Sequence, residues 1–228
     1  MVNTIFFDLD DTLLHFRRSE ANALRQALLE AGLPAGEAVL ARYHAITRRQ
    51  WELLEEGALT REQVMSTRFD ILFAELGVTA SGAATSNCYE ALLAEEHGVL
   101  PGAKALLEEL APRCRLFAAS NGSSAVQRRR LEGSGLRPYF RDVFISEEMG
   151  ADKPNPRFFH RCFASIPEFS PAASLIVGDS LTSDIRGGLN AGLRTCWFNP
   201  AGAPARPDIC PDHIITDLTQ LPPLLERL

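Results

Sequence analysis

The chain has 228 residues, enough for one or two domains, with 23 Lys and Arg against 29 Asp and Glu and a net charge of −6. Hydrophobic residues make up 46% and charged residues 23%, close to globular averages, which excludes a disordered or collagen-like chain. The acidic balance argues against a nucleic-acid polymer as partner, and without a stretch of roughly 20 apolar residues we expect no membrane span. We therefore expect a folded protein of enzyme size.

The cysteine pattern and the N-terminal sequence both lead us to expect a cytoplasmic protein. Val2–Phe7 runs directly into Asp8 with neither a basic segment nor a small-residue cleavage site, so we expect no signal peptide. The five cysteines are odd in number and form no C-x-x-C pair, which predicts free thiols in a reducing compartment rather than a disulfide framework or a zinc cluster.

The first strand is predicted at Val2–Phe7, a short apolar run that ends where a series of carboxylates begins. Helical periodicity follows and continues to about residue 98. Apolar side chains recur at i, i+3, i+4 and i+7 before Gly32 and again before Gly77, and Thr60 to Gln63 has the spacing of a capping box. We therefore predict a helical unit inserted after the first strand.

Strands and helices alternate in the second half of the chain. A further helix is predicted from Asn155 and Pro156, where Asn can cap and Pro suits the first helical position. The predicted strands are Arg115–Ala119, Val143–Ser146, Leu175–Val177, Thr195–Phe198 and a weaker His213–Ile215.

This alternation predicts an α/β fold, a Rossmann-like parallel sheet with helices on both faces. We expect a core domain made of residues 1–15 and 99–228, and an α-helical cap domain made of residues 16–98. Ligands of such sheets bind outside the carboxyl ends of the strands.

Polar side chains follow four of the predicted strands. They are Asp8 and Asp10 after the first, Ser120, Asn121 and Gly122 after the second, Lys153 after the third, and Asp179 with Asp184 after the fourth.

Carboxylates brought together repel one another and need a cation, and oxygen ligands favour Mg²⁺, which can also bind a substrate phosphate. We accordingly predict that three or four of these carboxylates, drawn from Asp8, Asp10, Asp179 and Asp184, bind the metal. Lys153 supplies a positive charge to Asp8 and to phosphoryl oxygens. The Ser120 hydroxyl and the N–H groups of Asn121 and Gly122, which we expect to open the next helix, suit an anion.

In order and in type, these residues resemble the motifs of the haloacid dehalogenase-like superfamily of phosphohydrolases. The first motif, D-x-D-x-T, is Asp8–Thr12, the second is Ser120, the third is Lys153, and the fourth runs from Gly178 to Asp184. The resemblance covers most of the chain outside the helical insert.

The resemblance implies a Mg²⁺-dependent phosphatase mechanism. Asp8 would be the nucleophile that becomes an aspartyl phosphate, and Asp10 the acid that protonates the leaving oxygen and then the base that activates water. Mg²⁺ would be held by the Asp8 carboxylate, the Asp10 backbone carbonyl and Asp179, with Asp184 binding directly or through water. The presence of Asp10 favours a phosphate ester, because the dehalogenases of the family lack this acid.

Motif spacing and one further segment indicate the substrate class. The 112 positions between Asp8 and Ser120 leave room for a helical cap, which in similar members of the superfamily accompanies a small-molecule substrate. The segment Asp184–Asn199 is most similar to the pyrimidine 5′-nucleotidase subgroup, which implies a pyrimidine nucleoside monophosphate.

Other functions stay open at this point. The substrate could be a sugar phosphate or phosphoglycolate, the reaction could be that of a phosphomutase, or the chain could be a regulatory protein that binds metal and phosphate without turnover. Monomer and homodimer are equally compatible with the sequence. Outside the motifs, we interpret Arg128–Arg130 as a solvated helix face, and Tyr43, Trp51 and Phe69 as core aromatics of the insert.

Overall fold

The computed structural model describes residues 2–228, and Met1, with which the expected core domain begins, lies outside this range. Two compact units divide the chain. Arg17–Glu96 forms a helical unit, and the residues up to Phe16 together with His97–Leu228 form a core unit. Among residues 2–228, no helix combines the length and the apolar character needed to cross a membrane.

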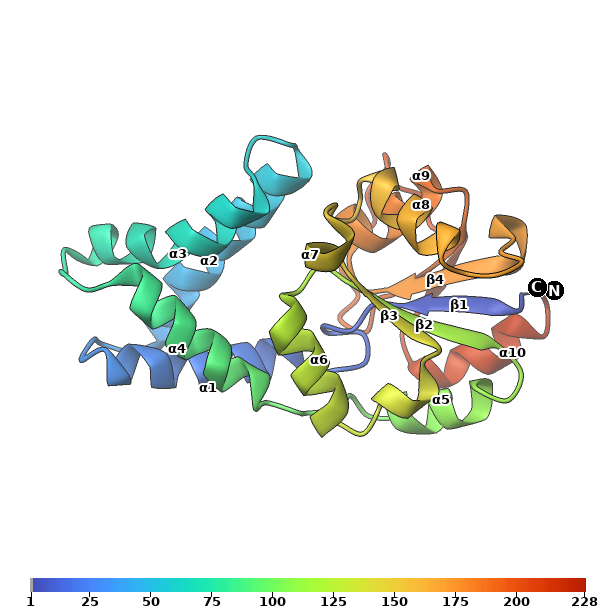
Figure 1. The fold of residues 1–228 in the computed structure, drawn as a ribbon, viewed down its shortest axis with the longest axis horizontal. Coiled ribbons are helices and arrows are strands. Elements are labelled where there is room, and N and C mark those ends of the chain that lie inside the picture. Colours follow the sequence, from blue (N-terminus) through green and yellow to red (C-terminus); the bar gives the residue numbers. More distant parts are fainter. Residues whose placement is uncertain (1) are drawn as a thin grey trace. The chain divides into compact units, whose positions relative to one another are not determined.

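The core unit is built on a six-stranded sheet in which every pairing is parallel (Figure 1). Its strands are β1 (Thr4–Phe7), β2 (Arg115–Ser120), β3 (Asp142–Ile145), β4 (Ser174–Gly178), β5 (Arg194–Phe198) and β6 (His213–Ile215). The spatial order β3-β2-β1-β4-β5-β6 places β1 between β2 and β4. The predicted α/β class with a Rossmann-like parallel sheet is confirmed, and each predicted strand is present within about two residues of its expected ends.

Between residues 2 and 228, ten α-helices accompany the sheet. In the helical unit they are α1 (Phe16–Glu30, whose first residue belongs to the core unit), α2 (Glu37–Glu55), α3 (Arg61–Leu76) and α4 (Gly82–Ala94). In the core unit they are α5 (Ala103–Leu110), α6 (Ser124–Gly133), α7 (Ser146–Met149), α8 (Pro156–Ala164), α9 (Arg186–Asn190) and α10 (Leu221–Leu225).

Successive side chains of β1 point to opposite faces of the sheet and pack into two different apolar clusters. Ile5 and Phe7 belong to an apolar cluster that includes residues of α5, α6 and α10, whereas Phe6 belongs to a second cluster with Phe158 and Phe159 of α8. All four residues of β1 are buried. A strand covered on both faces is expected to be an unbroken apolar run, which is what the sequence shows at this position.

Local sequence signals account for several helix ends. Thr60 and Gln63 form the predicted capping box at the start of α3, and that helix ends at Gly77 in the left-handed conformation with φ of 65°. The Asn155 side chain accepts a hydrogen bond from the Arg157 amide and begins α8, with Pro156 in the first turn. These capping side chains accept hydrogen bonds from backbone N–H groups that have no partner inside the helix.

The interior of the helical unit is aromatic. Tyr43 and Phe69 are fully buried with their ring centroids 4.9 Å apart, as the sequence interpretation expected. Trp51 is only half-buried, and the Arg61 guanidinium lies 5.6 Å from its ring centroid. Arg68 is almost fully buried and donates to Glu90 at 3.2 Å.

Phe6 is the most demanding packing position of β1. It is fully buried, and its ring centroid lies 5.6 Å from that of Phe117 and 6.1 Å from that of Phe159. We expect Phe6→Ala to lower the free energy of unfolding by about 3–5 kcal/mol because it leaves a cavity among these rings. Urea unfolding measures this effect. In the same unit, Ile214 of β6 is 54% exposed, and Ile214→Ala should change stability by less than about 0.5 kcal/mol. Equal losses in the two variants would contradict the packing argument.

Candidate active site

The parallel register brings the predicted site residues to one edge of the sheet. Phe7 pairs with Ala118 of β2 and with Val177 of β4, so the three strands end at nearly the same level. Asp8 directly follows β1, Ser120 ends β2, and Asp179 directly follows β4. This edge is where ligands bind in open parallel sheets, next to the point at which the strand order reverses.

Three carboxylates meet at this edge. Oxygen atoms of Asp8, Asp179 and Asp184 all lie within 4.8 Å of one another. Asp184 reaches the group from a π-helical turn, Leu181–Ile185, and accepts a hydrogen bond from the Ser180 amide at 3.0 Å. Gly178 allows this approach, because a Cβ at that position would lie 2.2 Å from an Asp184 oxygen.

Lys153 is buried against two of these carboxylates. Its Nζ donates to Asp8 at 2.8 Å, to Asp184 at 2.6 Å and to the Ala119 carbonyl at 2.5 Å, which uses all three of its hydrogens. Burial alone would disfavour the charge, but Asp184 and Asp8 outweigh it and raise the pKa of Lys153 above its ordinary value. Lys153 is therefore a fixed cation.

One ammonium does not neutralise three carboxylates. Burial, and to a smaller extent Asp184 and Asp10, raise the pKa of Asp8 to about 7 against the lowering effect of Lys153. Burial and the neighbouring Asp8 also raise the pKa of Asp179 well above its ordinary value. The ionised cluster carries an excess of two negative charges, and its donors are all carboxylate oxygens. Both properties fit a hard divalent cation such as Mg²⁺.

Two neighbouring side chains brace the cluster. The Thr12 hydroxyl lies 3.4 Å from an Asp8 oxygen as donor and accepts from the Asp179 amide at 3.1 Å, so it joins the loops after β1 and β4. The Trp197 indole donates to the Asp179 carbonyl at 2.7 Å.

Ser120 is oriented by the hydrogen bonds that it accepts. Its Oγ accepts from the Gly122 amide at 3.1 Å and from Gln127 Nε2 at 2.8 Å. Both lone pairs of the oxygen are then occupied, which leaves the hydroxyl hydrogen to be donated. The Gly122 amide, which we expected to face an anion, is engaged with Ser120 instead, and α6 begins at Ser124, two residues beyond Gly122.

Asn121 ties the loop after β2 to the segment that carries Lys153. Its side-chain oxygen accepts from the Lys153 amide at 2.8 Å, and its amide nitrogen donates to the Lys153 carbonyl at 2.8 Å. The Asn121 side chain thus holds the backbone of the lysine in place.

The Asp10 carboxylate points toward α6, whereas the three clustered carboxylates are those of Asp8, Asp179 and Asp184. Asp10 accepts from Gln127 Nε2 at 2.7 Å and pairs with the Arg130 guanidinium. The interpretation of residues 128–130 as a solvated face is therefore wrong for Arg130, which is fully buried.

A signal for this burial exists in the sequence. Gln127 and Arg130 are three positions apart and share a helix face with Val126 and Leu131, the buried apolar residues of α6. A helix that packs on a sheet with so few apolar residues must bury some of its polar ones. The sequence alone does not name their partner, because Asp10 lies 120 positions from Arg130.

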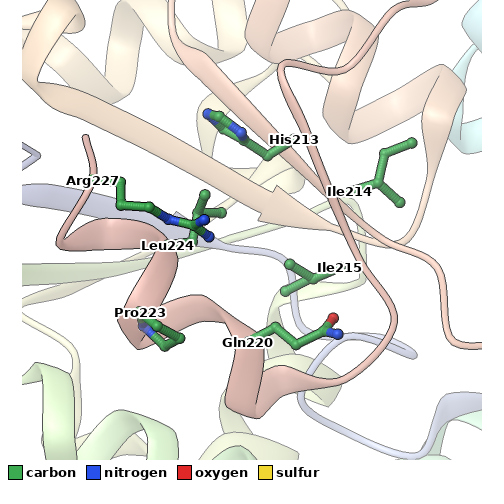
Figure 2. Close-up of a pocket in the computed structure, with 7 residues that line it drawn as sticks. All are labelled: His213, Ile214, Ile215, Gln220, Pro223, Leu224 and Arg227. Carbon is green, nitrogen blue, oxygen red and sulfur yellow. The ribbon is translucent and has the colours of Figure 1, made fainter.

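A separate hollow lies between the edge strand β6 and α10 (Figure 2). Its volume is about 390 Å³, and His213, Gln220 and Arg227 are among its lining residues. The motif residues described above do not line it.

Comparisons with known proteins place these observations in a family. A profile of haloacid dehalogenase-like hydrolases matches residues 2–192. The candidate HAD-hydrolase YfnB of Bacillus subtilis is 42% identical over 96% of this chain and 93% of its own. In its magnesium-bound crystal structure it superposes with a TM-score of 0.94 over 98% of each chain.

Two further relatives carry the name pyrimidine 5′-nucleotidase. PynA of Streptococcus pneumoniae is 41% identical over 86% of this chain and 83% of its own, and YjjG of Escherichia coli is 34% identical over 97% and 96%. The resemblance seen in the motifs is thereby confirmed. With four motifs in order at the ends of a parallel sheet, and relatives along almost its whole length, this hydrolase belongs to the haloacid dehalogenase-like family.

Proposed function

We propose that the protein is a Mg²⁺-dependent phosphomonoesterase that forms an aspartyl phosphate on Asp8 and acts on pyrimidine nucleoside 5′-monophosphates. The observation that carries the proposal is the buried contact between the Asp8 carboxylate and the Lys153 ammonium inside a cluster of three carboxylates. The Ser120 hydroxyl, whose hydrogen is left to be donated, ends the neighbouring strand β2. Such a set can attack a phosphorus atom and stabilise the charge on its oxygens.

In the first half of the reaction, an Asp8 oxygen attacks phosphorus and forms a new P–O bond. The bond from phosphorus to the ester oxygen breaks, its electron pair stays on that oxygen, and a proton from Asp10 completes the alcohol. Lys153 and the Ser120 hydroxyl offset negative charge on the transferring group.

In the second half, Asp10, now a carboxylate, takes a proton from water as the water oxygen attacks the phosphorus of the aspartyl phosphate. The bond to Asp8 breaks, its electron pair returns to the carboxylate, and inorganic phosphate leaves. Asp10 is again protonated, so the cycle is balanced.

Asp8, Asp179 and Asp184 are the side chains that would hold Mg²⁺, with the Asp10 backbone carbonyl as a further ligand. When bound, the cation supplies electrostatic stabilisation of the phosphoryl oxygens. Its two charges match the excess negative charge of the ionised cluster.

The substrate class rests on the relatives and on the inserted unit. PynA and YjjG, which cover most of this chain, are both named as acting on pyrimidine nucleotides. The helical unit enters the chain directly after the segment that carries Asp8 and Asp10. We propose that Arg17–Glu96 serves as a cap that excludes water during the reaction and selects a small phosphate ester.

The nucleophile is tested by Asp8→Asn. The amide oxygen can still accept from Lys153, so the fold should survive, but phosphate release should fall by at least about a thousandfold because the amide is a poor nucleophile. We would measure inorganic phosphate released from nucleoside monophosphates, sugar phosphates and phosphoglycolate, with Mg²⁺ and with EDTA.

Selective, Mg²⁺-dependent release from UMP, dUMP or dTMP supports the proposed substrate. Release confined to sugar phosphates or phosphoglycolate would keep the mechanism and reject the nucleotide, transfer without free phosphate would indicate a mutase, and absence of turnover would favour a binding protein. Full activity of Asp8→Asn would exclude the aspartyl-phosphate mechanism.

The raised pKa of Asp8 predicts how Mg²⁺ stabilises the protein at different pH. Between the ordinary value of 3.8 and about 7, the folded protein binds a proton on Asp8 that the unfolded chain has released, so without metal this group makes stability fall as pH rises through that window. Mg²⁺ competes with this proton and should stabilise more at pH 8 than at pH 5.5.

At one fixed Mg²⁺ concentration, about a hundredfold above the dissociation constant at pH 8, we expect Tm to rise by about 5 °C or more at pH 8 and by clearly less at pH 5.5. Thermal unfolding with and without Mg²⁺ measures the difference. Asp179→Asn removes one ligand and should abolish most of the shift at both pH values. Equal shifts at the two pH values in the unmodified protein would contradict the assignment.

A further inference from the structure

We infer that Gln127 and Arg130 of α6 are positioning residues for proton transfer by Asp10, and that Gln127 orients Asp10 and Ser120 together. The inference rests on the proposed function, in which Asp10 protonates the leaving oxygen. It assigns a role to two side chains that lie outside the four motifs.

The four side chains form one hydrogen-bonded set, in which Asp10, Gln127 and Arg130 close a ring and Ser120 is bonded to Gln127. Gln127 Nε2 donates one hydrogen to Asp10 Oδ2 at 2.7 Å and the other to Ser120 Oγ at 2.8 Å. Arg130 Nη1 donates to Gln127 Oε1 at 3.0 Å and to Asp10 Oδ1. Both Asp10 oxygens are thus held by α6, and the Gln127 amide cannot turn over without losing its bonds to Asp10 and Arg130.

Packing fixes the donors themselves. Arg130 is fully buried, and its guanidinium carbon lies 5.7 Å from the centre of the Phe16 ring. Gln127 is 1% exposed and lies so close to the loop after β2 that a Cβ at Gly122 would be 2.4 Å from its Cγ. Donors enclosed on several sides can hold a carboxylate in one orientation.

Asp10 itself keeps an open side. Its side chain is 25% exposed, and each carboxylate oxygen still has a lone-pair site beyond the bond from α6. When Asp10 gives its proton to the ester oxygen, the P–O electron pair stays on that oxygen and a carboxylate remains. The N–H groups of Gln127 and Arg130 stabilise this carboxylate where it forms.

Gln127 also acts on the second partner, Ser120. By occupying a lone pair of Ser120 Oγ, it helps to leave the hydroxyl hydrogen as the group that the serine offers to a phosphoryl oxygen. The Gln127 side-chain amide therefore fixes the position of the acid, Asp10, relative to the Ser120 hydroxyl that donates a hydrogen bond to the phosphate. A general acid must come within about 2.6–3.2 Å of the atom it protonates, so a small rotation of Asp10 would be costly.

The test compares two esters that differ in their need for an acid. A nucleoside monophosphate releases an alkoxide that requires a proton, whereas p-nitrophenyl phosphate releases a stable phenolate. The parameter is kcat/KM, which covers the steps up to departure of the leaving group and excludes the later hydrolysis of the aspartyl phosphate. Effects on phosphate binding through Ser120 are common to both esters and cancel in their ratio.

We expect Gln127→Leu to lower kcat/KM for the nucleotide by about 10–100-fold and for p-nitrophenyl phosphate by less than about threefold, since general acids contribute about 10²–10⁴-fold. Arg130→Lys, which keeps the charge but loses the fork geometry, should give a smaller change of the same kind. Should Arg130→Lys fail to fold, Gln127→Leu carries the test alone.

Arg128→Met is the matched control. Arg128 lies on the same helix, is 43% exposed and pairs with Glu148, so its loss should leave the ratio of the two kcat/KM values unchanged. An equal loss for both esters in Gln127→Leu, or no loss for either, would overturn the inference.

Asp10→Asn separates this inference from the proposed function on which it depends. If Asp10→Asn lowers kcat/KM selectively for the nucleotide and Gln127→Leu does not, only the positioning role is rejected. If Asp10→Asn itself shows no such selectivity, Asp10 is not the acid, and the proposed mechanism fails together with the inference.

Discussion

The enclosed ammonium of Lys153 is the interaction on which the rest of the site depends. It donates to two carboxylates and to a backbone carbonyl, and the lysine is only 1% exposed. Removing it would leave Asp8 and Asp184 as buried, unpaired charges, which is among the most costly changes in a protein interior. The Asn121 side chain holds Lys153 in position, because it bonds to both the amide and the carbonyl of the lysine backbone.

The parallel sheet explains why these groups can meet at all. Asp8 and Lys153 are 145 positions apart, yet parallel strands joined by crossovers all end at one edge. β1 lies between β2 and β4, so the residue that follows it is central to that edge. The apolar side chains of β1 stabilise this placement on both faces of the sheet.

Charge pairing divides the site into two parts. Asp8 and Asp184 pair with one buried cation, Lys153, and together with Asp179 they keep an excess of negative charge, which suits a divalent metal. Asp10 has a cation of its own in Arg130, and its carboxylate is turned toward α6. Two acids separated by a single residue are therefore in different electrostatic surroundings, which is a common way for neighbouring carboxylates to take different roles.

The sequence by itself determined the fold class, the strands and the motif residues, because apolar runs, capping residues and strand-end acids are local patterns. Only the tertiary structure decided that Arg130 is buried against Asp10 and that the Gly122 amide bonds to Ser120. Local periodicity marks which face of α6 is inward, but the partner on that face comes from a strand end more than 100 positions earlier. A buried arginine and a solvated arginine cannot be told apart in a sequence. What distinguishes them is the long-range contact with a carboxylate that neutralises the buried one.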